Sequence, residues 1–373
     1  MGYWQGKREL MMVKIAVVGA GRWGTHWTRI GLEHPDFQLG AVVDPIAASL
    51  DRMTERYGDR PPWQDVKLCP SLAAAMEAQP DDQPLEAVIV ATPAVDHVGT
   101  VSFALNQGLH VLVEKPVTMT VADGEKLAAI AQARRKILCI DHTYLFNGAV
   151  TAGKAFIAKG NLQTLRYGYA TRTHFAPVRQ DVDALWDLVI HDICIFNHWL
   201  DDFPTEVSAR GITWLQPGDS AQPAATSDYP VPANGLADQT WLVLRYGSGV
   251  EITIHLCWSN PDKQRRLVLV GDRGALVFDD LRAEQPLTFL GSEWKQGDRN
   301  QGQPLFSPQV DEPQGVAIEQ VEPLKAVADC FVEAIATGKI DPRSSADTGI
   351  GLVKVLAAAS RSLRWGGAWE SVL

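Results

Sequence analysis

The stretch Val13–Asp44 constrains the fold more than any other part of this 373-residue chain. It opens with a short β-branched run, as expected of a strand that is buried in a parallel sheet. A G-x-G-x-x-G motif follows at once, formed by Gly19, Gly21 and Gly24. A helical segment comes next, and a second apolar run then ends at Asp44. This order of strand, glycine turn, helix and strand predicts a complete βαβ unit.

The three glycines indicate that this unit binds a dinucleotide. Gly19 permits the tight turn, Gly21 lets the backbone approach a pyrophosphate, and Gly24 lets helix and strand pack closely. The pyrophosphate is expected at the helix N-terminus, beside Arg22 and Trp23, where free N–H groups and the helix dipole attract an anion. The alternative is a structural βαβ turn that holds no nucleotide.

Asp44 predicts which dinucleotide is bound. It stands twenty positions after Gly24, close to the spacing of a carboxylate that binds the ribose 2′-hydroxyl group. A carboxylate in that place repels the 2′-phosphate of NADP(H). The residue therefore favours NAD(H), with NADP(H) as the less favoured cofactor.

Length, charge and cysteines limit the class of protein. The chain exceeds the roughly 250–300 residues at which a single core stops growing, so two domains are expected. A net charge of −10 argues against nucleic-acid and acidic-membrane partners, and no apolar run approaches the roughly 20 residues of a membrane span. Five scattered cysteines fit a cytoplasmic protein better than a disulfide framework or a zinc site. Residues 1–12 lack the apolar core of a signal peptide and are expected to be an extension.

Residues 13–141 alternate between strand-like and helix-like segments, which predicts a doubly wound parallel sheet of the Rossmann type. Thr92 and Pro93 follow one of its strands, and Glu114 and Lys115 end another. Ligands bind outside the carboxyl ends of parallel strands. We therefore expect these residues to line one crevice together with the glycine turn.

Residues 142–373 follow a different pattern, which predicts an α+β domain on a largely antiparallel open sheet. Helices are expected at both ends of this segment, near 147–159, 183–200, 321–337 and 344–364. Strands with hairpin turns between them are expected at 205–215, 236–246, 250–258, 264–270 and 274–279. Stretches rich in turn residues, 216–235 and 291–320, are interpreted as long surface loops, and the pocket is expected to be shaped by loops within 145–182 and 205–260.

Together these motifs resemble the Gfo/Idh/MocA oxidoreductases, which include glucose–fructose oxidoreductase and inositol dehydrogenase. The resemblance spans nearly the whole chain. It rests on the glycine turn, on Thr92–Pro93 followed by His97, on Glu114–Lys115–Pro116, and on the D-x-x-x-H of Asp187 and His191. It implies a C-terminal sheet whose face carries the substrate and helps to form oligomers, here a homodimer or homotetramer.

Two local features refine the resemblance. The sequence around Trp23 and over residues 178–192 resembles a branch associated with sugar-nucleotide or polysaccharide metabolism. Many relatives carry an aspartate three residues after the histidine, where this chain has Cys194. This departure weakens any transfer of substrate from the inositol-type members.

Oxidising a secondary alcohol needs a proton acceptor and a group that stabilises the developing alkoxide. Asp187 and His191 are spaced i, i+4 on an otherwise apolar helix and so share a face. We interpret His191 as the general acid/base and Asp187 as its orienter or a substrate ligand. Lys115, whose family counterpart acts on the substrate oxygen, is interpreted as the electrostatic stabiliser, although base and stabiliser can exchange roles. The alternatives are a solvent-exposed lysine and a purely structural Asp–His pair.

Four further residues are assigned roles near the cofactor or the substrate. Glu114 is expected to line the nicotinamide pocket, and His97 to lie near the cofactor in a mainly structural role. Arg179 and Asp181 are interpreted as substrate ligands, with a solvated loop pair as the alternative. The histidines outside these motifs, including His34, lack metal-ligand spacing, so no metal site is expected.

These expectations combine into an NAD(H)-dependent dehydrogenase that transfers a hydride between nicotinamide and a secondary alcohol of a sugar, polyol or sugar nucleotide. An alternative is a non-catalytic, dinucleotide-binding regulator of the same fold. A third possibility is an enzyme that retains its cofactor and recycles it between two substrates. Retention of Lys115, Asp187 and His191 together favours an enzyme, because a sensor needs only the glycine turn.

Overall fold

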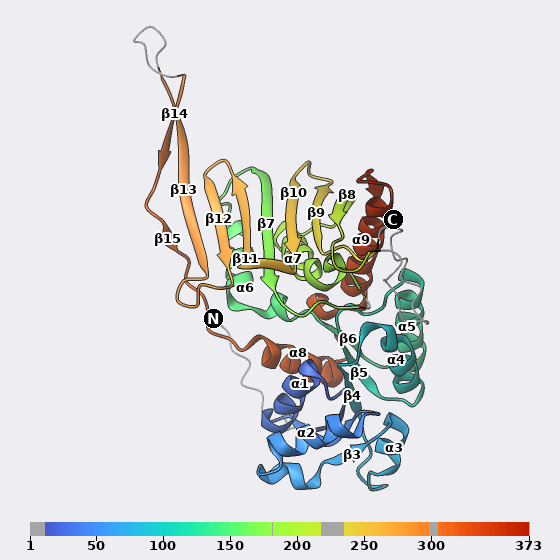
Figure 1. Ribbon diagram of the computed structural model, residues 1–373. Helices are drawn as coiled ribbons and strands as arrows, with labels where there is room; N and C mark the ends of the chain where they lie inside the picture. Colours follow the sequence, from blue (N-terminus) through green and yellow to red (C-terminus); the bar gives the residue numbers. More distant parts are fainter. Residues whose placement is uncertain (1–11, 181, 218–234, 298–304, 373) are drawn as a thin grey trace. The chain divides into compact units, whose positions relative to one another are not determined.

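The computed structural model describes residues 12–180, 182–217, 235–297 and 305–372 (Figure 1). These residues form two compact units, each made of two stretches of chain. The first unit contains residues 12–143 and Leu324–Ile350, and the second contains residues 144–323 and 351–372. Nearly all of the expected extension at residues 1–12 lies outside the described residues.

The first unit is built on a six-stranded parallel sheet. Its strands are β1 (Val13–Val18), β2 (Phe37–Val43), β3 (Lys67–Cys69), β4 (Ala87–Val90), β5 (His110–Glu114) and β6 (Leu138–Asp141). Their order, β3-β2-β1-β4-β5-β6, is that of a doubly wound dinucleotide-binding sheet. Every residue of β1 is buried, as the apolar run in the sequence indicates. The predicted Rossmann fold is confirmed.

The helices of this unit follow the expected alternation with strands. They are α1 (Arg22–Glu33), α2 (Ala47–Tyr57), α3 (Leu72–Glu77), α4 (His97–Asn106), α5 (Val121–Arg134) and α8 (Pro323–Thr337). Local sequence fixes the ends of α5: the Thr120 side chain accepts the N–H of Asp123, and Arg135 closes the helix in a left-handed conformation.

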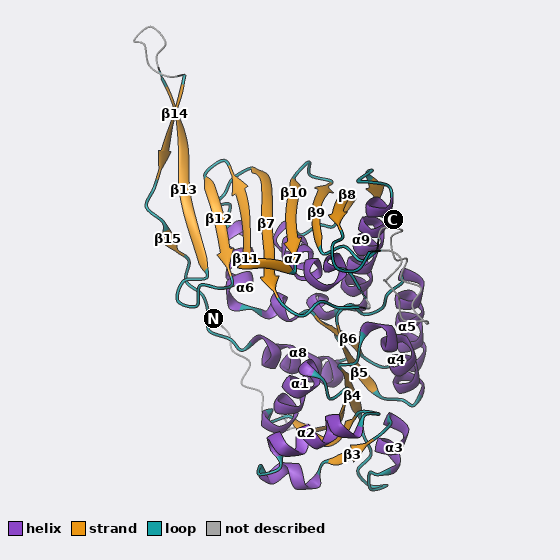
Figure 2. Cartoon of the chain, in the orientation of Figure 1, coloured by secondary structure: helices purple, strands orange, loops and turns teal. Residues whose placement is uncertain are grey.

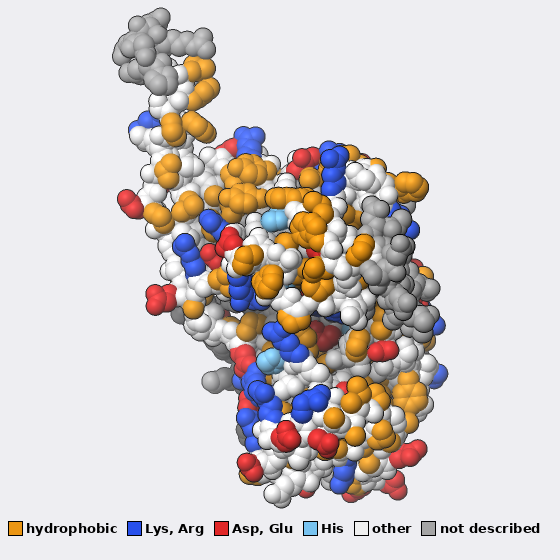
Figure 3. Space-filling model, viewed as in Figure 1, with side chains coloured by type: hydrophobic (Ala, Val, Ile, Leu, Met, Phe, Trp, Pro, Cys, Tyr) orange, Lys and Arg blue, Asp and Glu red, His pale blue; other side chains and the backbone are white. Residues whose placement is uncertain are grey.

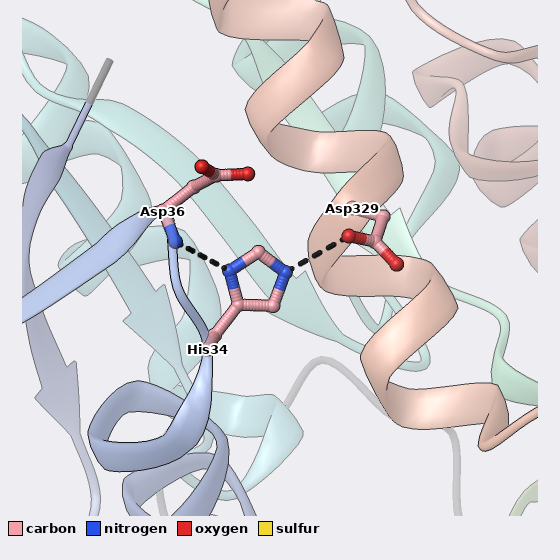
Figure 4. Close-up of side chains that lie close together, drawn as sticks. All are labelled: His34, Asp36 and Asp329. Atoms are coloured by element: carbon pink, nitrogen blue, oxygen red, sulfur yellow. Dashed lines mark hydrogen bonds and ion pairs between the residues drawn. The ribbon is translucent and has the colours of Figure 1, made fainter. Parts of the chain in front are cut away.

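Helix α8 reaches the first unit from a distant part of the sequence. Its apolar residues, among them Val327 and Phe331, are buried. Figure 4 shows Asp329 of α8 beside the imidazole of His34. His34 Nε2 lies 3.0 Å from Asp329 Oδ1, and its Nδ1 accepts the backbone N–H of Asp36 at 3.2 Å. A boundary drawn from chain order alone could not assign α8 to this unit.

The second unit is built on a ten-stranded sheet (Figure 2). Its strands are β7 (Leu165–Phe175), β8 (Pro204–Ile212), β9 (Gln239–Tyr246), β10 (Glu251–Cys257), β11 (Ser259–Gly271), β12 (Gly274–Asp279), β13 (Leu287–Gln296), β14 (Phe306–Val310), β15 (Gln314–Gly315) and β16 (Glu370–Ser371). The order is β14-β13-β12-β11-β7-β10-β9-β8-β16, with β15 beside β13. Only β7 and β10 pair in parallel among these strands, so the prediction of a largely antiparallel sheet is confirmed.

Two expectations for this unit are wrong. Strand β7 lies in a segment that was expected to contain loops; its inward positions are Gly168, Ala170 and Arg172, which give no apolar alternation. The expected loop over 291–320 contains β14, β15 and half of β13. Turn-forming and charged residues there hide a two-residue alternation. Residues 218–234 of the other expected loop lie outside the described residues.

One face of this sheet is covered by helices. Helix α7 (Ala184–Leu200) packs against β7, β9 and β10, and α6 (Gly148–Ala158) packs against β12. Helix α9 (Ala346–Arg364) joins the same unit through Ser360, which accepts a hydrogen bond from Trp186. Inward residues of the strands, such as Leu242 and Ile254, are fully buried.

The opposite face of the sheet carries exposed aromatic side chains. Tyr167, Tyr169 and Trp241 are 50%, 42% and 50% exposed, and Figure 3 shows hydrophobic side chains gathered on this face. The outer halves of β13 and β14 continue past the neighbouring strands as a two-stranded ribbon, named the β13–β14 ribbon below (Figure 1). No helix among the described residues has the length and apolar character of a membrane span.

Candidate active site

The glycine turn is shaped by packing at two of its glycines and open at the third. Gly19 has φ +98°, and a Cβ there would lie 2.6 Å from the carbonyl oxygen of Ala91. A Cβ on Gly24 would lie 1.7 Å from the carbonyl oxygen of Gly19. A Cβ on Gly21 would meet nothing within 4 Å. The backbone at Gly21 is therefore bare where a pyrophosphate is expected to approach.

Helix α1 starts directly after this open backbone. Its N-cap is Gly21, which has no side chain to satisfy the first N–H groups, and Arg22 and Trp23 are exposed. Uncapped N–H groups and the positive end of the helix dipole form an anion-binding position. These residues fit a bound dinucleotide.

Asp44 follows the last residue of β2 and accepts two backbone hydrogen bonds. Oδ2 accepts from the N–H of Ala20 at 2.8 Å, and Oδ1 accepts from the N–H of Ile46 at 2.9 Å. Each carboxylate oxygen has a second lone pair that can accept a ribose hydroxyl. Asp44 thus also stabilises the glycine turn, a role that its spacing in the sequence does not reveal.

His97 joins the ends of two strands. Its Nδ1 lies 2.9 Å from the carbonyl oxygen of Pro116, and its Nε2 lies 3.0 Å from that of Thr92. The ring is 1% exposed, and burial lowers the pKa of His97. This geometry fits the structural reading of His97. Thr92 Oγ1 is buried with no hydrogen-bond partner among the described residues, and the neighbouring Pro93 is exposed.

Two buried carboxyl groups lie beside Lys115. Glu114 accepts a hydrogen bond from Trp27 Nε1 at 3.0 Å and stands opposite Asp141 in the β5–β6 register. Burial, and next the charge of Asp141, raise the pKa of Glu114 well above its ordinary value; burial also raises the pKa of Asp141. Both shifts favour the protonated form of these carboxyl groups. The ammonium of half-buried Lys115, which precedes a cis peptide bond to Pro116, opposes both shifts.

Asp187 and His191 share one face of α7, as predicted. Both are half-buried, whereas the helix residues between them are fully buried. The helix begins at the N-cap Asp183, whose carboxylate accepts the N–H of Trp186. Asp187 and His191 are thus polar groups at partly exposed positions of a largely apolar helix.

Neighbouring side chains contact this pair. Arg179 Nη1 donates to Asp187 Oδ1 at 3.3 Å, and the ring of Tyr144 lies 4.8 Å from that of His191, centroid to centroid. The structure therefore brings Arg179, Asp187 and His191 together in the second unit. Asp181 lies outside the described residues.

The sequence does not identify Arg172 and Tyr144 near His191, and it gives Asp192 no clear role. Arg172 and Asp192 form a buried ion pair, with Nε 3.0 and 3.1 Å from the two carboxylate oxygens and Nη2 2.6 Å from one of them. Tyr144 lies within 3.4 Å of Arg172 through its hydroxyl group. Arg172 belongs to β7, which the sequence does not predict, and Asp192 is not part of a motif. Their importance is visible only from the ion pair that they form in the structure.

The cluster around His34 brings three ligand-type groups together. The ligand atoms of His34, Asp36 and Asp329 lie within 4.8 Å of one another. Both ring nitrogens of His34 already take part in hydrogen bonds (Figure 4), so the observed geometry joins α8 to the loop before β2. Asp329 is 295 positions away from His34, and no spacing rule reaches that far.

The fold and these motifs agree with comparisons to known proteins. Residues 13–142 match the oxidoreductase family model with the NAD-binding Rossmann fold, and residues 148–277 match the GFO/IDH/MocA C-terminal domain. The chain belongs to the Gfo/Idh/MocA oxidoreductase family. The resemblance read from its motifs is confirmed.

Individual relatives of this family member include sugar-nucleotide and inositol dehydrogenases. UDP-N-acetylglucosamine 3-dehydrogenase of Acidithiobacillus ferrooxidans is 26% identical over 54% of this chain, and the match spans 59% of that enzyme's length. The NAD(+)-dependent scyllo-inositol 2-dehydrogenase of Bacillus subtilis is 22% identical over 75% of this chain and 78% of its own. A solved putative oxidoreductase from Magnetospirillum magnetotacticum is 28% identical, with a TM-score of 0.71 over 92% of this chain and 98% of its own.

Proposed function

We propose that this family member is an NAD(H)-dependent dehydrogenase acting on a secondary alcohol of a sugar, polyol or sugar nucleotide. The observation that carries the proposal is the placement of Asp187 and His191. They are two half-buried polar groups, spaced i, i+4, on a largely buried helix, in a chain whose other unit offers Lys115 at a strand end of a dinucleotide-binding sheet. In this proposal residues 13–141 bind the cofactor, and residues 142–373 supply the substrate and assembly surfaces.

The cofactor is proposed to lie over Gly21 and the start of α1, with Asp44 on the adenosine ribose. The cofactor would be surrounded by Arg22, Trp23, Thr92, Pro93 and Glu114. His97 would have a structural role, because it joins the ends of two strands near the cofactor. When bound, NAD(+) supplies the hydride acceptor at nicotinamide C4. The carboxylate of Asp44 supports a preference for NAD(H) over NADP(H).

The protein's own part in the reaction is to move one proton and stabilise one charge. As the substrate carbon gives up its hydride, the hydroxyl oxygen loses its proton and a carbonyl group forms. His191 accepts that proton in this proposal, and Lys115 stabilises the negative charge that develops on the oxygen. Asp187 orients the imidazole or binds a second hydroxyl group, and Arg179 contacts Asp187 from the adjoining loop.

The substrate class is proposed from the relatives. The names of these relatives indicate a UDP-linked amino sugar and an inositol. Each of these compounds contains a ring with several hydroxyl groups. In this chain Cys194 is buried three residues after His191, and burial raises the pKa of its thiol. A buried thiol cannot replace the carboxylate that many relatives carry at that position, which argues against transferring the substrate of the inositol-type members to this chain.

A dehydrogenase screen followed at 340 nm tests the proposal. The protein is assayed with NAD and with NADP against UDP-sugars, polyols and aldoses. Turnover with NAD and a hydroxylated ring compound is expected. Tight NAD(H) binding without turnover on any of them would instead favour the regulator, and NADH absorbance in the purified protein would indicate a retained cofactor.

Substitutions then assign the roles. Lys115→Ala, Asp187→Asn and His191→Ala are each expected to lower kcat by about 10²–10⁴-fold, the range of acid–base groups, while NAD(H) affinity changes little. His198→Ala, on the last turn of the same helix, is the matched control and should keep wild-type kcat. Wild-type turnover by all three site variants would refute the assignment.

A further inference from the structure

The imidazole of His191 rests against the phenol ring of Tyr144. Their ring centroids are 4.8 Å apart, and the ring planes are inclined at 49°. Tyr144 lies in the short turn Thr143–Phe146, just before α6, and is half-buried. The two residues are far apart in sequence, so their contact depends on the fold of the second unit.

Tyr144 is itself held in place. Its hydroxyl group donates a hydrogen bond to Asp280 Oδ2 at 2.8 Å and accepts a longer one from Arg172 Nη1 at 3.4 Å. The Arg172 guanidinium also lies 5.1 Å from the centre of the phenol ring. Arg265 Nη1 lies 3.3 Å from the same oxygen of Asp280 and helps to anchor that carboxylate.

The backbone next to His191 is fixed by the same guanidinium. Asp192, the following residue, is fully buried and receives hydrogen bonds from both Nε and Nη2 of Arg172. Arg172 therefore connects the main chain at His191 with the ring that packs on its side chain. Removing either contact would leave the imidazole freer to turn about χ2, a torsion with broad preferences in histidine.

We propose that Tyr144, held by Asp280 and Arg172, is a positioning residue that sets the orientation of the His191 imidazole for proton transfer. The inference rests on the proposed role of His191. The inference can be tested separately from the catalytic role of His191, because the contact between the two rings can be measured without a substrate. A misplacement of about 1 Å at a reacting group can lower the rate by about 10²-fold, so the contact is large enough to matter.

The test compares Tyr144→Phe, which keeps the ring, with Tyr144→Leu, which removes it. With histidine-labelled protein, NMR resonances of the His191 ring are assigned by their loss in His191→Gln. Tyr144→Leu should shift these resonances by removing the ring current, whereas Tyr144→Phe, which keeps the ring and its contact with the Arg172 guanidinium but loses the hydroxyl bonds, should shift them less. With substrate, Tyr144→Leu is expected to lower kcat at least tenfold with KM changed less than threefold, and Tyr144→Phe to retain kcat within about threefold.

Tyr246→Leu is the matched control for lost packing. Tyr246 is a buried tyrosine of the same unit whose hydroxyl group donates to Asn197 of α7 at 2.7 Å, but it contacts a different part of the helix. Tyr246→Leu should lower the melting temperature at least as much as Tyr144→Leu does, and it should leave the His191 resonances unshifted.

Unshifted His191 resonances together with wild-type kcat in Tyr144→Leu would overturn the proposal. Equal losses of kcat in the Phe and Leu variants would also overturn it, because the ring would then not be the positioning element. Failure of the proposed function appears differently: His191→Ala would keep full turnover, whatever Tyr144 does to the NMR spectrum.

Discussion

Glu114 and Asp141 face each other across the ends of β5 and β6, with the ammonium of Lys115 next to them. Two carboxyl groups in one buried place cannot both ionise without strong repulsion. Burial raises the pKa of both groups, and for Glu114 the neighbouring charge of Asp141 adds to that effect, so that its pKa lies well above the ordinary value.

This arrangement makes the stability of the protein depend on pH. The unfolded chain releases the Glu114 proton near the ordinary value of 4.5, while the folded chain keeps it to higher pH. The contribution of Glu114 to stability therefore falls as pH rises above about 4.5. Glu114→Gln mimics the protonated acid. We expect it to match wild type in melting temperature near pH 5 and to exceed it at pH 8; a constant difference between the two pH values would contradict the raised pKa of Glu114.

Asp44 sets a second prediction at the scale of the residue. Wild-type protein should bind NAD(H) more tightly than NADP(H) by about 1.5–3 kcal/mol, from one charged hydrogen bond and the repulsion of the 2′-phosphate. Asp44→Asn should reduce this difference in binding free energy between the two cofactors. Because Asp44 also holds the N–H groups of Ala20 and Ile46, the ratio of the two dissociation constants, measured by fluorescence titration, is the informative quantity. Equal affinities in the wild type would rule the preference out.

Single residues could be predicted where a motif fixes the local backbone. The glycine turn, the end of β2 at Asp44 and the i, i+4 pair on α7 follow from spacing within one short segment. Tyr144, Arg172 and Asp141 could not be found in this way, because each acquires its partner through tertiary contacts. A buried arginine such as Arg172 even weakens the strand pattern in which it lies.

At the scale of elements, α8 is attached to the first unit partly through one buried imidazole. His34 is fully enclosed and directs Nε2 toward Asp329, whose carboxylate is half exposed. An unsatisfied buried donor costs about 1–3 kcal/mol. We therefore expect Asp329→Ala to lower the free energy of unfolding by about that amount in denaturant titrations. Asp329→Asn retains an acceptor and should lose clearly less; equal losses would show that the hydrogen bond is unimportant.

The β13–β14 ribbon shows why some elements escape sequence analysis. In its register Trp294 stands opposite Pro308, Gln296 opposite Phe306 and Ser292 opposite Val310, so apolar residues gather on one side of the ribbon. Glu293, Lys295, Ser307 and Gln309 take the other side. Read along the chain, these residues give a mixed polar composition; only the pairing of the two strands separates them into faces.

At the scale of the whole molecule, exposed aromatic surface predicts assembly. Residues on even positions of β13 share the sheet face of Tyr169, because Thr288 pairs with Val277, Val277 with Val268, and Val268 with Tyr169. Trp294 and Phe306, 69% and 57% exposed, thus extend that face along the ribbon. Large exposed apolar patches usually mark an interface.

We therefore expect a homodimer or homotetramer at micromolar concentration, measured by light scattering. The double substitution Trp294→Ser and Phe306→Ser should shift the protein toward smaller species without lowering the melting temperature of the monomer, since both side chains lie at the surface. A monomeric mass for the wild type would refute the prediction.

The route of the chain through its two units has a consequence for biosynthesis. The ribosome delivers all six strands of the parallel sheet by residue 141, but α8, with its buried residues Val327 and Phe331, emerges about 180 residues later. Until then the nascent dinucleotide-binding unit lacks the segment Leu324–Ile350. A gene fragment that stops near residue 143 would encode the motif in full and still yield an incomplete unit, whereas joining Leu324–Ile350 to it would restore the missing segment.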